Sequence, residues 1–431
     1  MASPAHVADA SREREQLAQR PFVLYWLARV LAMLARQMVA VAVGWQMYAL
    51  TGSALDLGLV GLAQFVPAFF LMLVAGHVAD RFDRRRVVQA CVAVEAMAAL
   101  GLCAGTALGR IDATTIFALV FVIGAARAFE MPTMQALLPA LVPDALLARA
   151  IAANASAGQA AIIAGPALGG LLYIAGPAIV YGTGTALLTA TAVIVHFVRP
   201  RRSAARMSSP DVSSVLEGIR FIRGHPAVLG AISLDMFAVL LGGATALLPI
   251  FARDILHTGP WGLGLLRSAT AVGALGMALW LAHHPLRGRA GRRMFAGVAL
   301  FGVATIVFGV SRSFALSLAA LIVLGASDMI SVVVRQSLVQ LQTPDYMRGR
   351  VSAVNSLFIG TSNQLGEFES GVTAAWLGVV PSVIVGGIGT LAIVLLWMRL
   401  FPALASVDRL EAPVVVKRIT PAQHAPTASP P

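Results

Sequence analysis

Long apolar stretches separated by short polar segments set the pattern of this sequence. Twelve stretches are apolar for about 20 residues, which is enough for an α-helix to cross a hydrocarbon core roughly 30 Å thick. The pattern therefore predicts an all-α, polytopic membrane protein with twelve transmembrane helices. The predicted spans are 22–49, 54–79, 87–108, 114–134, 150–174, 178–198, 227–252, 261–283, 293–311, 314–338, 350–376 and 381–400.

The second half of the chain repeats the first. Residues 124–171 and 325–372 align without a gap, and polar identities as well as glycines are shared. The repeat predicts two pseudo-symmetric six-helix bundles, residues 21–198 and 227–402, joined by a linker at 199–226. Parallel repeats of this kind, with a binding site between the halves, are typical of transporters. The aligned pairs include Gly124 with Gly325, Gln135 with Gln336, Pro143 with Pro344, Arg149 with Arg350, Asn154 with Asn355, Gly165 with Gly366, and Gly170 with Gly371.

Composition and charge agree with a membrane location. Apolar residues make up 58% of the chain and charged residues only 12%, far from an ordinary soluble domain. The net charge of +12 predicts no nucleic-acid partner, because most cations fall in the tails and in the loops at 80–86, 199–226, 284–293 and 339–350. Cationic loops stay in the cytoplasm, so both termini are expected there. Residues 1–20 and 403–431 are expected to form cytoplasmic tails, the second disordered.

The loop after the second span holds Gly76, Asp80, Arg84 and Arg85. A cytoplasmic loop alone explains the arginines, but it does not explain the spacing of the glycine and the acid. The segment resembles the loop 2–3 signature of the major facilitator superfamily. The resemblance implies a cytoplasmic latch between the halves, which Glu130 is expected to join by pairing with Arg84. Asp83 stands where the family usually has glycine.

The fifth span contains Gly165, Pro166, Gly169 and Gly170. Small residues at this spacing let helices approach closely, and proline bends the helix, so packing alone is one interpretation. The segment also resembles the helix-five signature of proton-linked exporters in the superfamily. Together with the eleventh span it is similar to the bacterial subfamily that includes the enterobactin exporter and macrolide and multidrug efflux proteins.

Ionisable residues inside the spans each need a partner, water or a function, because burial in lipid is costly. The resemblance places helices one, four, seven and ten around a central cavity. Asp235 and Asp328 are either proton carriers or members of permanent bridges, Asp235 with Arg36 and Asp328 with Arg335. Glu367 is a further candidate proton site, and Glu95 is expected to reach water at the loops. The candidate proton-coupling or cavity charges are Asp235, Asp328, Glu367, Arg36, Arg127 and Arg335.

Several aromatic side chains could offer an apolar wall to a substrate, although packing is their default role. They are Trp45, Phe65, Phe69, Phe237 and Phe251. Neither Cys91 nor Cys103 is expected to form a disulfide or a metal site.

The resemblance implies a secondary transporter that exports a small amphipathic compound in exchange for protons, with alternating access. No loop of the type that holds ATP phosphates is present, so the proton gradient is the expected energy source and no cofactor or enzymatic activity is expected. The expected partners are a small-molecule substrate, protons and lipid, and the expected state is a monomer. A proton-linked uptake permease and a non-transporting membrane scaffold or sensor are the alternatives.

Overall fold

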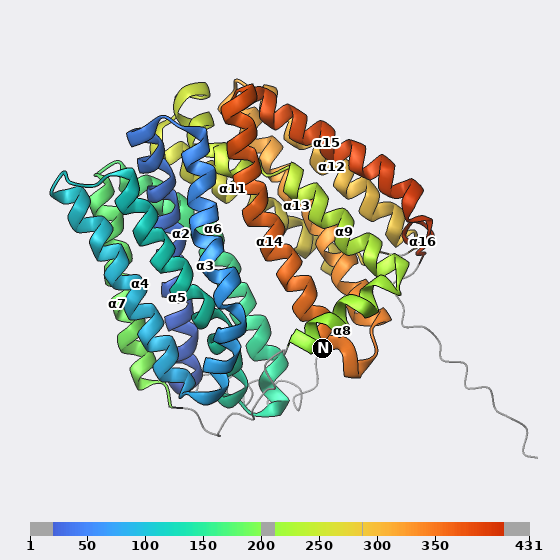
Figure 1. The fold of residues 1–431 in the computed structure, drawn as a ribbon, viewed down its shortest axis with the longest axis horizontal. Coiled ribbons are helices and arrows are strands. Elements are labelled where there is room, and N and C mark those ends of the chain that lie inside the picture. Colours follow the sequence, from blue (N-terminus) through green and yellow to red (C-terminus); the bar gives the residue numbers. More distant parts are fainter. Residues whose placement is uncertain (1–19, 200–211, 287, 409–431) are drawn as a thin grey trace, which may run out of the picture.

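The computed structural model describes residues 20–199, 212–286 and 288–408, and Figure 1 shows their arrangement. All regular structure within these ranges is helical. Most of the predicted N-terminal tail, residues 200–211 of the linker and residues 409–431 of the C-terminal tail lie outside the described part, so the disorder expected of the second tail stays a prediction.

Six long helices build the N-terminal half. Short polar side chains begin three of them: Ser53, Asp83 and Asp112 each accept a backbone N–H of the first turn, which satisfies donors that a helix end leaves free. The helices are α2 (Arg20–Thr51), α3 (Ala54–Arg81), α4 (Arg84–Ala107), α5 (Ala113–Leu137), α6 (Leu147–Tyr173) and α7 (Pro177–Phe197).

Six long helices also build the C-terminal half. They are α9 (Pro226–Leu241), α11 (Gly259–His283), α12 (Ala290–Val310), α13 (Phe314–Gln342), α14 (Asp345–Leu377) and α15 (Val379–Leu400). The predicted span 227–252 is not one continuous helix. It breaks at Gly242 and Gly243 and continues as three short pieces, η3 (Ala244–Leu247), α10 (Leu248–Ile250) and η4 (Phe251–Ile255).

Eleven helical segments within the described ranges are long and apolar enough to cross a membrane. Helix α14, the eleventh predicted span, is not among them although it is 33 residues long. Its charged residues Arg348, Arg350, Glu367 and Glu369 lower its apolar character. The all-helical membrane fold is therefore confirmed, whereas the count of twelve spans stays a prediction.

Two segments expected to be linker and tail contain ordered structure. Within the linker, α8 (Val212–Arg223) packs on α14, where Glu217 forms an ion pair with Arg350. After α15, the short helix α16 (Pro402–Ala405) leads to Asp408, whose carboxylate accepts the backbone N–H of Arg289 at 2.8 Å. Residues 403–408 are thus fixed on the loop before α12 and do not belong to a disordered tail.

Equivalent glycines of the sequence repeat make equivalent contacts between the two halves. In the N-terminal half Gly170 of α6 meets the backbone of α11 at Gly264, and its counterpart Gly371 of α14 meets the backbone of α3 at Gly58. A Cβ atom at Gly371 would lie 2.8 Å from the Cα of Gly58. The halves thus meet along two seams, α6 with α11 and α3 with α14. The same repeat position allows close packing at both seams, as small residues do between membrane helices.

The halves converge at one end of the molecule and spread apart at the other (Figure 1). At the converging end one apolar cluster contains residues of both halves, for example Met47 with Leu247. At the other end, which holds the Arg-rich α3–α4 loop and is called the basic end here, the clusters stay within one half. The backbones of the two halves therefore lie farther apart at the basic end than at the converging end (Figure 1).

Candidate substrate cavity

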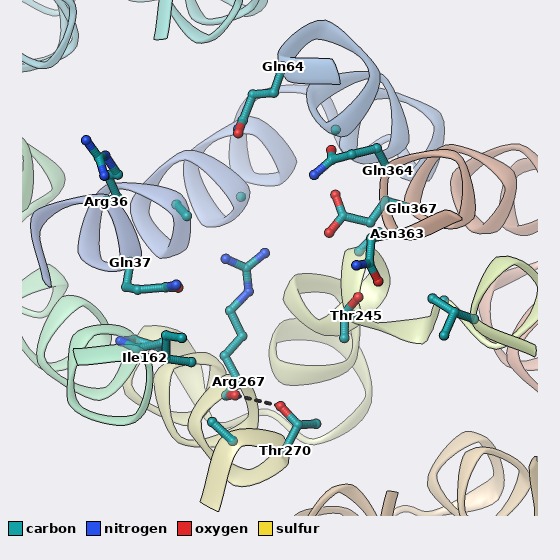
Figure 2. Close-up of a pocket in the computed structure, with 18 of the residues that line it drawn as sticks. Arg36, Gln37, Gln64, Ile162, Thr245, Arg267, Thr270, Asn363, Gln364 and Glu367 are labelled. Atoms are coloured by element: carbon teal, nitrogen blue, oxygen red, sulfur yellow. Dashed lines mark hydrogen bonds between the residues drawn. The ribbon is translucent and has the colours of Figure 1, made fainter. Parts of the chain in front are cut away.

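A cavity of about 790 Å³ lies between the two halves. On α2 its lining runs from Arg29 to Gly44, and on α5 from Arg127 to Gln135, which places it in the middle of the molecule and toward the basic end. Figure 2 shows part of its lining. The polar residues around it are Arg29, Arg36, Gln37, Gln64, Arg127, Glu130, Gln135, Gln159, Thr245, Arg267, Thr270, Asp328, Asn363, Gln364 and Glu367.

The opposite end of the cavity is closed by contacts between the halves. Tyr48 at the end of α2 donates a hydrogen bond to Asp254 of η4, and the Arg253 guanidinium lies 5.5 Å from the centre of the Tyr48 ring. One turn before Tyr48 on α2, on the cavity side, a Cβ atom on Gly44 would touch Pro249 at 3.4 Å. A solute in the cavity therefore has access from the basic end only.

In the N-terminal half, one cation is shared by two acids. Nε of Arg36 lies 2.7 Å from Oε2 of Glu95, and Nη2 of Arg36 lies 2.7 Å from Oε2 of Glu130. Glu95 is only 1% exposed, so the expectation that it reaches loop water is wrong. Arg127 lies close by and donates to Oε1 of Gln64 at a long 3.5 Å.

The ion-pair cluster around Arg36 takes up one residue that was predicted to belong to the latch at the α3–α4 loop. Glu130 pairs with Arg36 and not with Arg84 as expected, because it points into the bundle and away from the loop. Arg84 donates to the backbone oxygen of Ala136 at 2.9 Å and Arg85 to that of His196 at 3.0 Å, so both fix helix ends within the N-terminal half.

The remaining latch residues lie on the same loop. Gly76 is on α3, the side chain of Asp80 lies outside the described part, and the role of the latch stays a prediction. Asp83, which replaces the usual glycine, caps α4 by accepting the backbone N–H of Arg85 at 2.9 Å.

In the C-terminal half the buried acid Asp235 is paired with Arg335, and Ser331 donates to it at 2.9 Å. The two bridges considered from the sequence, Asp235 with Arg36 and Asp328 with Arg335, are therefore both wrong. Asp235 and Arg335 are 4% and 3% exposed and do not line the cavity. Asp328 does line it, and within the described chain no hydrogen bond or ion pair reaches its carboxylate.

Two opposite charges face the cavity from the seam helices. Arg267 of α11 points into the open space, and Glu367 of α14 lies on the far wall (Figure 2). No ion pair within 4.0 Å joins them in the part of the chain that the structure describes. Glu367 was among the predicted site residues. Arg267 was recognisable in the sequence as a charge inside an apolar span, but it was not among the predicted site residues.

Amide side chains surround these charges, and sequence reasoning missed them. Gln37 and Gln64 contribute from the N-terminal half, and Asn363 and Gln364 from the C-terminal half (Figure 2). Amides between apolar residues carry no charge that would mark them in a membrane span. Their position around one space follows only from how the helices are turned.

The glycine and proline segment of α6 packs tightly on both sides. Gly165 and Gly169 face α2, where a Cβ on Gly169 would lie 2.8 Å from the Cα of Met38. Gly170 faces α11, and nearby Ser268 donates to the oxygen of Ile163 at 2.6 Å, across the two halves. Pro166 lines the cavity. Close packing thus accounts for the glycines, and a part in proton coupling stays a prediction.

The aromatic side chains that were named from the sequence are packed in the protein and do not form a wall of the cavity. None of the five named aromatics lines the cavity; Phe251, for example, is fully buried against Phe308, with ring centres 4.4 Å apart. Phe301 is the aromatic residue that does line it. In the described residues, no group of three His, Cys, Asp or Glu side chains is placed to hold a metal ion.

Comparison with known sequences places this geometry in context. The chain matches the profile of the transmembrane secretion effector family over residues 15–421. An enterobactin exporter of Citrobacter koseri is 27% identical over 384 residues, which cover 88% of this chain and 91% of that protein. An enterobactin exporter of Shigella dysenteriae serotype 1 is 25% identical over 373 residues, covering 86% and 89% of the two chains.

Solved structures share the fold at low identity. A bacterial homologue of the human lysosomal transporter Spinster superimposes with a TM-score of 0.72 at 12% identity, covering 89% of this chain and 97% of its own. A bacterial homologue of the iron transporter ferroportin gives 0.68 at 16% identity, covering 90% and 99%. The nucleoside transporter NupG gives 0.69 at 12% identity, covering 89% and 99%.

Proposed function

Because this chain belongs to the transmembrane secretion effectors of the major facilitator superfamily, and is thus a multi-pass inner-membrane transporter and not an enzyme, we propose that it exports a small amphipathic compound by exchange for protons. A siderophore or a drug-like molecule is the substrate class that the similarity to enterobactin exporters favours. The working unit is a monomer in the lipid bilayer.

The observation that carries the proposal is the cavity between the halves, closed at one end and lined by ionisable side chains. Its volume of about 790 Å³ lies within the range of pockets that enclose drug-sized ligands. If the basic end is cytoplasmic, as its arginines favour, the cavity is loaded from the cytoplasm. Release then requires the converging end to open.

Alternating access fits the way in which the halves meet. They touch along two seams, α6 with α11 and α3 with α14, and both seams use glycine at equivalent repeat positions. Rocking of one bundle against the other would open these seams at one end while the basic end closes. The Tyr48–Asp254 contact would break in that movement.

The carboxylates of Asp328 and Glu367 are the proton sites we propose. Both face the cavity, and neither has an ion-pair partner within the described residues, so either can gain or lose a proton without breaking a bridge. Asp235 has a different role, because its charge is already balanced by Arg335 and Ser331.

Everted membrane vesicles test the proposal. Respiration acidifies their lumen, and addition of an exported compound from a panel of labelled siderophores and antibiotics should release protons and load the lumen with the label. Asp328→Asn or Glu367→Gln should lower the proton release at least about tenfold, whereas Glu217→Gln, at the exposed pair with Arg350, should not. No proton movement with any compound would overturn antiport, and loss of label from preloaded vesicles would identify an uptake permease.

A further inference from the structure

Arg267 lines the cavity without a counter-charge within ion-pair distance among the described residues, in contrast to Arg36. Arg36 forms ion pairs with Glu95 and Glu130, but no acid lies within ion-pair distance of Arg267 in the part of the chain described. An uncompensated guanidinium away from bulk water is costly, so such a group is retained where a ligand or a function balances it.

The surroundings of Arg267 have the chemistry of an anion site. Its side chain extends from α11 into the open space, and Gln37, Gln64, Asn363 and Gln364 stand around that space (Figure 2). Each amide offers two N–H donors, and the guanidinium offers a planar fork that matches a carboxylate or a similar oxyanion. Phe301 and other apolar residues of the wall complete an amphipathic surface.

We infer that Arg267 binds an acidic group of the substrate, so that the exported compound is an amphipathic anion held by Arg267 and by amides of both halves. This inference rests on the proposed function, because it names the substrate class of the same cavity. Contact with amides of both halves lets the ligand influence how the halves pack. Glu367, on the far wall, disfavours an acidic group close to itself and so orients the ligand toward Arg267.

The assignment has an electrical consequence. An anion that leaves a cell with a negative interior moves with the membrane potential, as a proton entering the cell does. Exchange of the two is therefore electrogenic, and the potential as well as the pH difference drives export.

Equilibrium binding to the full-length protein in lipid nanodiscs tests the inference. The probes are radiolabelled 2-naphthoate and naphthalene-2-sulfonate, with neutral 2-naphthamide as the matched control. Wild type should bind both acids, and the amide at least about tenfold more weakly. Arg267→Gln should weaken the acids about 10- to 100-fold and leave the amide unchanged, as expected for loss of a charge-assisted bond. Arg312→Gln, which removes an exposed arginine outside the cavity, should behave as wild type.

Arg267→Lys provides a second variant that keeps the charge but loses the fork, and it should fall between wild type and Arg267→Gln. The inference is overturned if wild type binds neither acid, or if it binds the amide as tightly as the acids. It is also overturned if Arg267→Gln or Arg267→Lys binds the acids as wild type does. Gel filtration of each variant checks that it is folded. These outcomes are separate from the antiport test. Selective acid binding without proton exchange in vesicles would disprove antiport alone, and proton-coupled export of neutral compounds alone would disprove the anion site.

Discussion

At the scale of single residues, the buried charges of this transporter separate into two kinds. Arg36 with its two glutamates, and Asp235 with Arg335, are paired by ion bridges that hold helices of one half together. Asp328, Arg267 and Glu367 face the cavity without such partners among the described residues. The first kind should therefore matter for stability and the second for transport.

Arg36→Met tests the stabilising role. The substitution keeps a similar apolar stem but leaves Glu95 and Glu130 buried without their cation, which should lower the free energy of unfolding by about 3–5 kcal/mol. Thermal unfolding of the purified protein would report it as a lower melting temperature. Arg85→Met, which loses one bond from a partly exposed arginine to His196, should cost about 1 kcal/mol. Equal effects of the two variants would disprove the cluster's role.

At the scale of the helices, glycines decide where the halves meet. Gly371 of α14 sits against Gly58 of α3, whereas Gly360 on the same helix has open space around it. A methyl group at position 371 therefore cannot be accommodated without moving α14 away from α3. The other glycine seam, between α6 and α11, is subject to the same limit.

Gly371→Ala should loosen the closed end of the transporter. Overlap of this kind costs about 1–3 kcal/mol, which corresponds to a roughly 5- to 150-fold shift toward the state open at that end. A cysteine at Leu57, buried on the cavity wall, should then react faster with a membrane-impermeant thiol reagent added at that end. Gly360→Ala is the matched control, because it makes the same change of residue type on α14. If Gly360→Ala also speeds the reaction of the cysteine at position 57, the effect comes from helix propensity in general and not from the contact with Gly58.

At the scale of the whole molecule, the cavity has access from one end only. Met131 lines it and is 51% exposed, while Arg110 is exposed at the converging end, between α4 and α5. These positions report both the direction of opening and the orientation in the membrane. Replacing Cys91 and Cys103 by serine removes background labelling of the native cysteines.

In that background, Met131→Cys should be labelled by an impermeant thiol reagent in everted vesicles and not in right-side-out vesicles, since the basic end is expected in the cytoplasm. Arg110→Cys should show the reverse. Labelling of both positions from the same side would contradict a cavity that opens at one end. Labelling of Met131→Cys only in right-side-out vesicles and of Arg110→Cys only in everted vesicles would show that the predicted orientation is inverted.

The sequence by itself determined the helices, the duplication and the family resemblance. Apolar length is a local property, so each span can be recognised without its neighbours, and the repeat showed which glycines are equivalent. Even so, α14 was less apolar than a simple span, and the break at Gly242 and Gly243 was missed, because a glycine pair within apolar residues does not by itself end a helix.

Only the tertiary structure decided which charges pair and which face the cavity. Asp235 bonds to Arg335 and not to Arg36, and Arg267 enters the cavity from a seam helix. In lipid, the outward side of a helix is as apolar as its packed side, so the spans carry little amphipathic pattern to reveal how each is turned. That rotation is set by packing between helices far apart in sequence, and it determines the chemistry of the cavity.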